Sequence, residues 1–282
     1  MTDASSLLPG LEEQWIEHRG ARMRLFAGGT ELVAGGAPPL LLIHGYGGAA
    51  WNFSELAPLL PGRRLLIPDL PGHAASAPLP AGPTMAAYAD AVAACLPPEP
   101  VDVFGHSMGG AVALRLAERR PELVRRIVLA AAAGITSSTR LSEITITLIG
   151  IVQPARILGR RAGRIAGSRR LRRLVFGSFE VSNPDLLTER SVHGLLRGPT
   201  MHTDALGAGR ALSADDPRRD LDRVRCPVLV LWGARDRQVP LEDGFEYARR
   251  LHAPVRVIAD CGHLLISERP DACARAALEF LR

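Results

Sequence analysis

A stretch in the middle of the chain, residues 101–120, restricts the fold more than any other part of the sequence. Val101–Phe104 is an apolar run that predicts a short buried strand, and Ala111–Arg120 has the apolar spacing of a helix. Between them lies Gly105-His106-Ser107-Met108-Gly109, which matches the pattern Gly-x-Ser-x-Gly. A strand, a tight turn and a helix in this order form the context in which that pattern presents a serine nucleophile.

The turn also assigns roles to the residues around Ser107. Gly105 and Gly109 shape the bend beside His106, because neither has a Cβ that would clash there. The helix start behind Ser107 supplies free amides, beginning with the Met108 N–H, and a partial positive charge that suits an oxyanion. The alternative is an ordinary strand-to-helix turn in which Ser107 is only a helix N-cap.

Strands and helices alternate along most of the chain, which predicts an α/β fold with a mostly parallel central sheet and helices on both faces. Strands are expected at 14–19, 22–27, 40–43, 64–67, 101–104, 126–131, 227–232 and 255–259, and helices at 52–60, 84–96, 111–120, 241–251 and 270–281. The alternation stops at Gly134 and resumes after Ser213. We therefore expect a core at 1–133 and 214–282, with a helical cap at 134–213 inserted after the sixth core strand.

The net charge of +5 is concentrated in this cap, and the chain contains no lysine. Residues 134–213 hold 12 arginines and 5 acids (+7), whereas the rest of the chain holds 22 arginines and 24 acids (−2). Within 153–177, eight arginines and no acid alternate with apolar residues at helical spacing, including Leu171, Leu174 and Val175. Such a stretch can contact an anionic membrane or attract an amphiphilic acyl substrate to the mouth of the site, or it can be only a solvated outer face. Aromatic residues are few there, which argues against nucleic acid as a partner.

Composition limits the other classes of protein. With 47% hydrophobic and 22% charged residues, the chain has the composition of a globular protein. No apolar run reaches the roughly 18–20 residues of a membrane span. Residues 1–14 carry acids and no basic residue, and the four cysteines show no paired spacing, so a cytoplasmic location is expected. No metal or phosphate-loop motif is present, so no cofactor is expected, and nothing indicates the oligomeric state.

A serine nucleophile needs a base and an acid that orients the base. His263 is the expected base, because it follows the last predicted strand and should lie at the sheet edge that also carries Ser107. Asp236 directly follows the preceding strand and is the favoured acid. Asp260 is a rival but stands only three residues before His263, and Asp69 lies in a turn that looks structural. The order Ser, Asp, His accompanies the Gly-x-Ser-x-Gly elbow.

An oxyanion needs two amide donors, and the loop after residues 40–43 is the expected source of the second. This loop reads His44-Gly45-Tyr46-Gly47. Its glycines allow close approach of the main chain to a ligand, so the Tyr46 N–H is expected to join that of Met108. The alternative is a glycine-rich turn without function.

These motifs together resemble the α/β-hydrolase superfamily, in the branch with one helical cap between the sixth and seventh core strands. The resemblance extends from about Gln14 to Arg282 and is carried by His44-Gly45-Tyr46-Gly47, Asp69-Leu70-Pro71-Gly72-His73, the Ser107 elbow, Trp232-Gly233-Ala234-Arg235-Asp236 and Gly262-His263. It implies a serine hydrolase that cleaves a small-molecule carboxylic ester, lactone or thioester through an acyl-enzyme on Ser107.

Departures from the patterns of related subfamilies leave other functions open. Ser107 argues against the haloalkane dehalogenases and epoxide hydrolases, which carry a carboxylate at that position. The carbon–carbon bond hydrolases of aromatic degradation share the Ser-Met-Gly-Gly elbow and are the alternative. They usually carry Asn and Trp where this chain has His106 and Leu264. A non-catalytic receptor of the same fold is a further possibility.

Overall fold

One sheet forms the centre of the computed structural model, which describes residues 7–29, 36–138, 158–177 and 181–282. Within these ranges the strand order is β1-β2-β4-β3-β5-β6-β7-β8. β1 and β2 form an antiparallel hairpin, β2 pairs antiparallel with β4, and every later pairing is parallel. The strands are β1 (Leu11–His18), β2 (Ala21–Gly29), β3 (Leu40–Ile43), β4 (Arg64–Pro68), β5 (Val101–His106), β6 (Val124–Ala130), β7 (Val228–Gly233) and β8 (Val255–Ile258).

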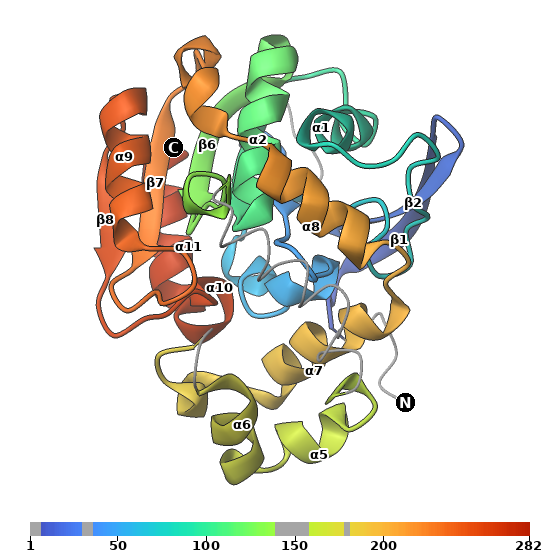
Figure 1. The fold of residues 1–282 in the computed structure, drawn as a ribbon, viewed down its shortest axis with the longest axis vertical. Coiled ribbons are helices and arrows are strands. Elements are labelled where there is room, and N and C mark those ends of the chain that lie inside the picture. The colour runs from blue at the N-terminus through green and yellow to red at the C-terminus, as the bar shows by residue number, and fades with distance from the viewer. Residues whose placement is uncertain (1–6, 30–35, 139–157, 178–180) are drawn as a thin grey trace.

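The sheet interior explains why its central strands are continuous apolar runs. Every residue of β3, β5 and β7 is buried, as expected for parallel strands covered on both faces. In Figure 1, α1 (Met85–Ala93), α2 (Met108–Arg119) and α8 (Ala205–Ala214) lie in front of the sheet, and α11 (Pro270–Phe280) lies behind it. The mostly parallel α/β fold predicted from the sequence is therefore confirmed.

Local signals account for most helix boundaries. The Thr84 side chain caps α1 by accepting from the Ala87 N–H at 3.0 Å. α9 spans Leu241–Leu251 and α11 begins at Pro270, both as expected. The helix expected at 52–60 is instead two short 3₁₀ helices, Ala50–Phe53 and Ala57–Leu59. The short helix α10 (Leu265–Glu268) was not expected.

Between β6 and β7 the chain forms helices beyond the carboxyl ends of the parallel strands (Figure 1). α5 (Ala162–Ala166), α6 (Arg169–Phe176) and α7 (Glu189–Arg197) share a small apolar cluster of their own. The buried side chains of α8 join the main core instead. Residues 139–157 and 178–180 lie outside the described residues, and the cap boundaries at 134–213 stay a prediction.

The apolar face expected on α6 is only partly buried. Phe176 is buried and Val175 packs against the cap cluster, whereas Leu171 and Leu174 are 37% and 77% exposed. α6 has only two turns, so its last residues reach the cluster and its middle does not. The helical apolar spacing predicted over Leu171, Leu174 and Val175 is therefore buried only at its C-terminal end.

Candidate active site

Ser107 occupies a sharp turn between β5 and α2. Its φ of +55° lies in the left-handed region, which is costly for a residue other than glycine. Three main-chain bonds hold it there: the Ser107 N–H donates to the Ala130 carbonyl at 3.0 Å, and the Ser107 carbonyl accepts from Gly110 at 2.9 Å and Ala133 at 3.0 Å. The neighbouring strands and α2 therefore determine the conformation of the serine.

The glycines beside Ser107 are required by close main-chain packing. A Cβ on Gly105 would lie 2.4 Å from the Gly109 carbonyl oxygen, and one on Gly109 would lie 2.1 Å from the Ile43 carbonyl oxygen. A Cβ on Gly45 would lie 2.8 Å from the Ser107 Cβ. The loop after β3 thus packs directly on the serine, and no larger residue fits at these three positions.

The structure brings Ser107, His263 and Asp236 together although they are far apart in sequence. His263 Nδ1 lies 2.8 Å from Asp236 Oδ2, and His263 Nε2 lies 3.0 Å from Ser107 Oγ. A carboxylate can only accept, so the imidazole proton belongs on Nδ1. Nε2 is then free to accept the proton of the serine hydroxyl.

The Asp236 carboxylate is held by the turn that follows β7. Its Oδ1 accepts from the N–H groups of Gln238 and Val239, each at 2.9 Å, while Oδ2 faces His263. The carboxylate is fully buried. Main-chain groups of the core therefore orient the carboxylate toward the imidazole.

The two rival acids lie elsewhere. Asp260 is exposed and forms an ion pair with Arg235 at 2.6 Å. Asp69 is buried, and its Oδ1 accepts from the Ala50 N–H at 2.7 Å while its Oδ2 accepts from Arg24 Nε at 2.7 Å. Asp69 therefore holds the loop after β3 to β2, as its predicted structural role requires.

His106 contacts the loop that carries His263. Its Nε2 donates to the His263 carbonyl at 2.9 Å, and the two rings are 5.1 Å apart. Burial, followed by the proximity of His263, lowers the pKa of His106 to about 3. His106 is therefore neutral near pH 7. Its role is to hold the His263 loop through this hydrogen bond, not to act as a second base.

The loop after β3 presents main-chain amides at the same place. The Gly48 N–H donates to the Gly45 carbonyl at 3.0 Å, which closes a turn with Tyr46 and Gly47 at its centre. Gly47 has φ of +65°, a conformation that favours glycine. The buried His44 ring donates from Nδ1 to the Gly45 carbonyl at 2.8 Å. Met108, as the first residue of α2, has one of the amides that lack an intrahelical partner.

Two buried side chains near the triad were not predicted from the sequence. Glu268 of α10 accepts from the N–H groups of Gly262 at 3.0 Å, Ser182 at 3.0 Å and Asn183 at 2.9 Å, so it joins the His263 loop to the cap. His202 joins the cap to the loop after β3. The sequence does contain a signal for Glu268, because it is a single acid that follows the apolar residues after His263. It contains no comparable signal for His202.

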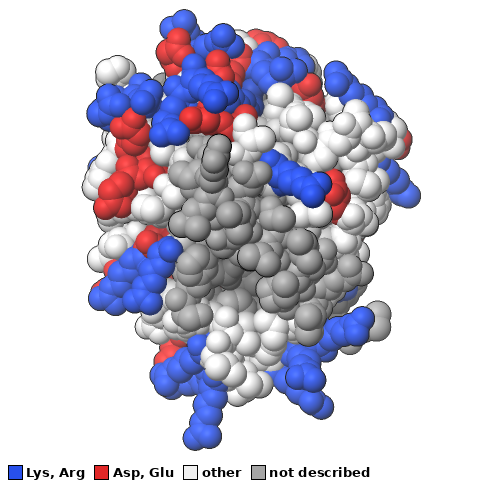
Figure 2. Space-filling view, viewed as in Figure 1, with Lys and Arg blue, Asp and Glu red and all other residues white. Residues whose placement is uncertain are grey.

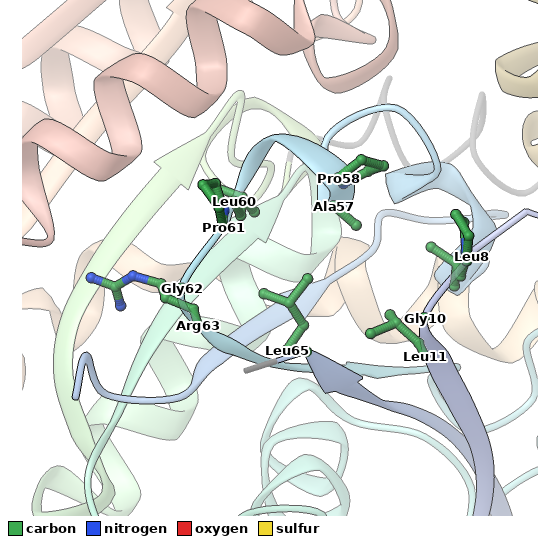
Figure 3. Close-up of a pocket in the computed structure, with 12 residues that line it drawn as sticks. Leu8, Gly10, Leu11, Ala57, Pro58, Leu60, Pro61, Gly62, Arg63 and Leu65 are labelled. Carbon is green, nitrogen blue, oxygen red and sulfur yellow. The ribbon is translucent and has the colours of Figure 1, made fainter. Parts of the chain in front are cut away.

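A shallow pocket elsewhere on the molecule is not part of this site. It has a volume of about 180 Å³ and is lined by apolar side chains that include Leu8, Leu11, Pro58 and Leu65 (Figure 3). Leu65 lies at the start of β4, so this pocket is near the amino edge of the parallel strands, whereas Ser107 follows the carboxyl end of β5. The described residues contain no cluster of three His, Cys, Asp or Glu side chains arranged for a metal ion.

Comparison with known proteins identifies the class of this site. Residues 38–270 match the model of the family described as "alpha/beta hydrolase fold". The chain belongs to the α/β-hydrolase fold family, and the prediction of this family and of a hydrolase is confirmed. The nucleophile elbow and the paired histidine and acid are arranged as in that fold.

Relatives of known name are similar over most of the chain. A pimeloyl-[acyl-carrier protein] methyl ester esterase of Aromatoleum aromaticum is 36% identical over 84% of this chain and 95% of its own. A dihydrolipoyllysine-residue acetyltransferase component of the acetoin cleaving system of Cupriavidus necator is 31% identical over 92% of this chain and 66% of its own. The crystal structure of a putative lipase of Acinetobacter baumannii has a TM-score of 0.75 at 21% identity, covering 96% of this chain and 91% of that one, which shows the shared fold.

Proposed function

We propose that the protein hydrolyses carboxylic esters through a covalent acyl-enzyme on Ser107. The observation that carries this proposal is the continuous chain of short contacts from Asp236 through His263 to Ser107 Oγ. The relatives named as esterases favour the same reaction over cleavage of a carbon–carbon bond. The protein is therefore an ester-hydrolysing α/β hydrolase, as the sequence predicts.

The geometry supports a two-step mechanism. His263 Nε2 takes the Ser107 hydroxyl proton as Oγ attacks the ester carbonyl carbon, and the N–H groups of Tyr46 and Met108 hold the resulting oxyanion. The bond to the alcohol then breaks, and His263 returns the proton to the departing oxygen. A water molecule, deprotonated by His263, then attacks the acyl carbonyl carbon. The bond to Ser107 Oγ breaks, His263 returns the proton to Oγ, and the carboxylic acid is released. Asp236 keeps the imidazole in the required tautomer and stabilises its cationic form.

The substrate class follows from the relatives and is part of the proposal. A methyl ester of an acyl chain carried by a protein is the substrate named for the relative in Aromatoleum aromaticum. Esters of a small alcohol and a longer acyl chain are therefore the first candidates here. The test is a panel of p-nitrophenyl and methyl esters of graded acyl length, run beside a ring-cleavage diketone. Turnover of the diketone without turnover of any ester would contradict the proposal.

We also propose that the tip of the cap, formed by α6 (Arg169–Phe176), contacts an anionic membrane surface. Arg169, Arg170 and Arg173 surround the exposed Leu171 and Leu174 on α6. Figure 2 shows basic side chains projecting from the end of the molecule at which α5 and α6 lie in Figure 1. Exposed leucines among arginines can insert between anionic headgroups while the arginines pair with phosphates.

Part of this charge is neutralised within the protein. Asp185 pairs with Arg173 at 2.5 Å and with Arg169 at 3.5 Å. Seven arginines and no acid lie between 158 and 177, so an excess of positive charge remains on the tip.

A cytoplasmic location is also proposed, because four free cysteines suit a reducing compartment. Within the described ranges, no helix has the length and apolar character needed to cross a membrane.

A further inference from the structure

His202 lies outside the triad but contacts the loop that carries the proposed oxyanion donor. It stands between the 3₁₀ helix Gly198–Met201 and α8 and is only 7% exposed. Its Nδ1 accepts from the Ala74 N–H at 2.8 Å, and its Nε2 donates to the Gly47 carbonyl at 2.8 Å. An amide N–H can only donate, so the Ala74 bond requires the tautomer with its proton on Nε2.

The Gly47 carbonyl belongs to the turn that presents the Tyr46 amide. Tyr46 and Gly47 are the two central residues of this turn, and Gly47 takes the positive φ that its second central position requires. The bond from His202 holds the turn at the residue next to Tyr46. A side chain of the cap thus restrains the main chain that would bind the oxyanion.

Two further histidines complete a column of rings beneath this turn. His44 holds the Gly45 carbonyl from the core side, as His202 holds Gly47 from the cap side. The His73 ring stands between them, with centroids 5.2 Å from His44 and 5.1 Å from His202. Burial lowers the pKa of His44 to about 4, and burial followed by the two neighbouring rings lowers that of His73 well below its ordinary value. His44 and His73 therefore stay uncharged near pH 7 and can pack edge to face.

The same cap segment is bonded to the loop after β4. The N–H groups of Thr203 and Asp204 donate to the Gly72 carbonyl at 3.0 and 3.1 Å. A Cβ on Gly72 would lie 2.9 Å from the Asp204 Cβ, so the contact needs a glycine there. These bonds fix where His202 enters the core and hence where its ring meets Gly47.

We propose that His202 is a positioning residue, whose bond to Gly47 couples the placement of the cap to the Tyr46 amide of the oxyanion hole. The proposal rests on the proposed function. A catalytic group displaced by about 1 Å can lose about a hundredfold in rate. Because the oxyanion forms only as the reaction proceeds, loss of the bond lowers kcat more than it raises KM.

The test compares His202→Leu with His202→Gln. Glutamine can accept from Ala74 and donate to Gly47, whereas leucine can do neither. With p-nitrophenyl acetate, kcat of His202→Leu is expected to fall about 10- to 100-fold with KM changed less than about threefold, and His202→Gln is expected to regain most of it. Turnover is counted per Ser107 that a fluorescent phosphonate labels, so that misfolded protein does not enter the comparison.

Glu55→Ala is the matched control. It removes another bond between cap and core, from Thr188 Oγ1 to Glu55 Oε1 at 2.6 Å, which does not involve the turn at Gly47. Its kcat is expected to equal that of the wild type. An unchanged kcat in His202→Leu, a His202→Gln variant no better than His202→Leu, or an equal loss in Glu55→Ala would each overturn the proposal.

A second readout separates this proposal from that of ester hydrolysis. Butylboronic acid adds to an active-site serine as a tetrahedral anion that needs the oxyanion donors, and its binding requires no turnover. We expect it to bind His202→Leu about tenfold more weakly than the wild type. A wild type that binds the boronate with this difference but hydrolyses no ester would support the role of His202 and refute the proposed function. A wild type that does neither would overturn both.

Discussion

The carboxyl edge of the sheet around Ser107 and the tip of the cap at α6 differ in how tightly their side chains are packed. Around Ser107, main-chain atoms pack so closely that three glycines are required, and Asp236 accepts three hydrogen bonds. On α6, Leu174 is 77% exposed, and the side chains of Arg169 and Arg173 are 69% and 62% exposed. The difference shows that the first region holds its reacting atoms at fixed distances, whereas the second leaves its apolar and basic side chains in contact with solvent.

The largest expected effect tests the tightly packed region around Ser107 directly. Ser107→Ala removes the nucleophile and is expected to lower kcat by about 10⁵- to 10⁶-fold, leaving only what binding and the oxyanion donors supply. The measurement is turnover of the best ester of the panel. Labelling of the wild type by an organophosphonate, mapped by mass spectrometry, should place the adduct on Ser107. An active wild type that carries no adduct there would contradict the assignment.

The next effect tests whether the acid was assigned correctly. Asp236→Asn should retain the fold but favour the wrong imidazole tautomer, which is expected to lower kcat by about 10⁴-fold. Asp260→Asn is the control, because Asp260 is exposed and paired with Arg235. Its turnover should match the wild type. A larger loss for Asp260→Asn than for Asp236→Asn would reverse the assignment.

A smaller effect is expected at the tip of the cap. Replacing Arg169, Arg170, Arg172 and Arg173 by Gln should weaken binding to vesicles rich in phosphatidylglycerol by about a thousandfold at low salt, since each arginine near an anionic surface contributes about 1 kcal/mol. Turnover of a small soluble ester should stay nearly unchanged. Binding of the wild type should fall as salt rises, because the Debye length shortens to about 8 Å at physiological ionic strength.

Four exposed arginines of the core make a matched control for this variant. Replacing Arg219, Arg223, Arg225 and Arg275 by Gln changes the net charge equally but leaves α6 intact. This control should bind vesicles nearly as the wild type does. If the wild type does not bind anionic vesicles at low salt, the tip is only a solvated face. Equal losses in both variants would show attraction by net charge alone.

The smallest expected effect concerns the buried, neutral imidazoles of His44 and His106, which lie near Ser107. The pKa values of about 4 for His44 and about 3 for His106 lie below the ordinary value of 6.5, so between these values the unfolded chain binds protons that the folded chain does not. Stability is therefore full above pH 6.5 and falls as the pH falls. The free energy of unfolding should drop by on the order of 2 kcal/mol per imidazole between pH 7 and pH 5.

Urea unfolding at the two pH values measures this dependence. His106→Gln keeps a donor for the His263 carbonyl but cannot titrate, so its stability should fall less steeply with decreasing pH than that of the wild type. Equal slopes for the two proteins would show that His106 does not contribute.

Much of the fold could be predicted because its signals are local. A run such as Leu40–Ile43 is buried on both faces in a parallel strand, and Pro270 starts a helix that it could not continue from within. The parallel alternation places the residues after β5, β7 and β8 at one edge of the sheet. That topological rule, without any distance, was enough to propose Ser107, Asp236 and His263 as neighbours.

The cap was harder to predict because its stability depends on which neighbours it meets. α6 has helical apolar spacing, but the spacing alone does not say that Phe176 is buried while Leu174 is exposed. α8 looks like part of the same insertion and yet packs its buried residues into the main core. Only the arrangement of these short helices in space decides which apolar side chains lose contact with water.

The sequence by itself determined the elbow around Ser107, the mostly parallel α/β fold and the edge at which the site lies, because turn geometry and hydrophobic periodicity act over a few residues. The tertiary structure alone decided which polar atoms meet across long separations. His202 and Gly47 are 155 residues apart, and His263 and Ser107 are 156 residues apart. Strand topology brings Ser107 and His263 to one edge of the sheet, and the tertiary structure adds the hydrogen-bond distance between them. The pairing of His202 with Gly47 has no such signal, since it arises only when the returning cap lies on the loop after β3.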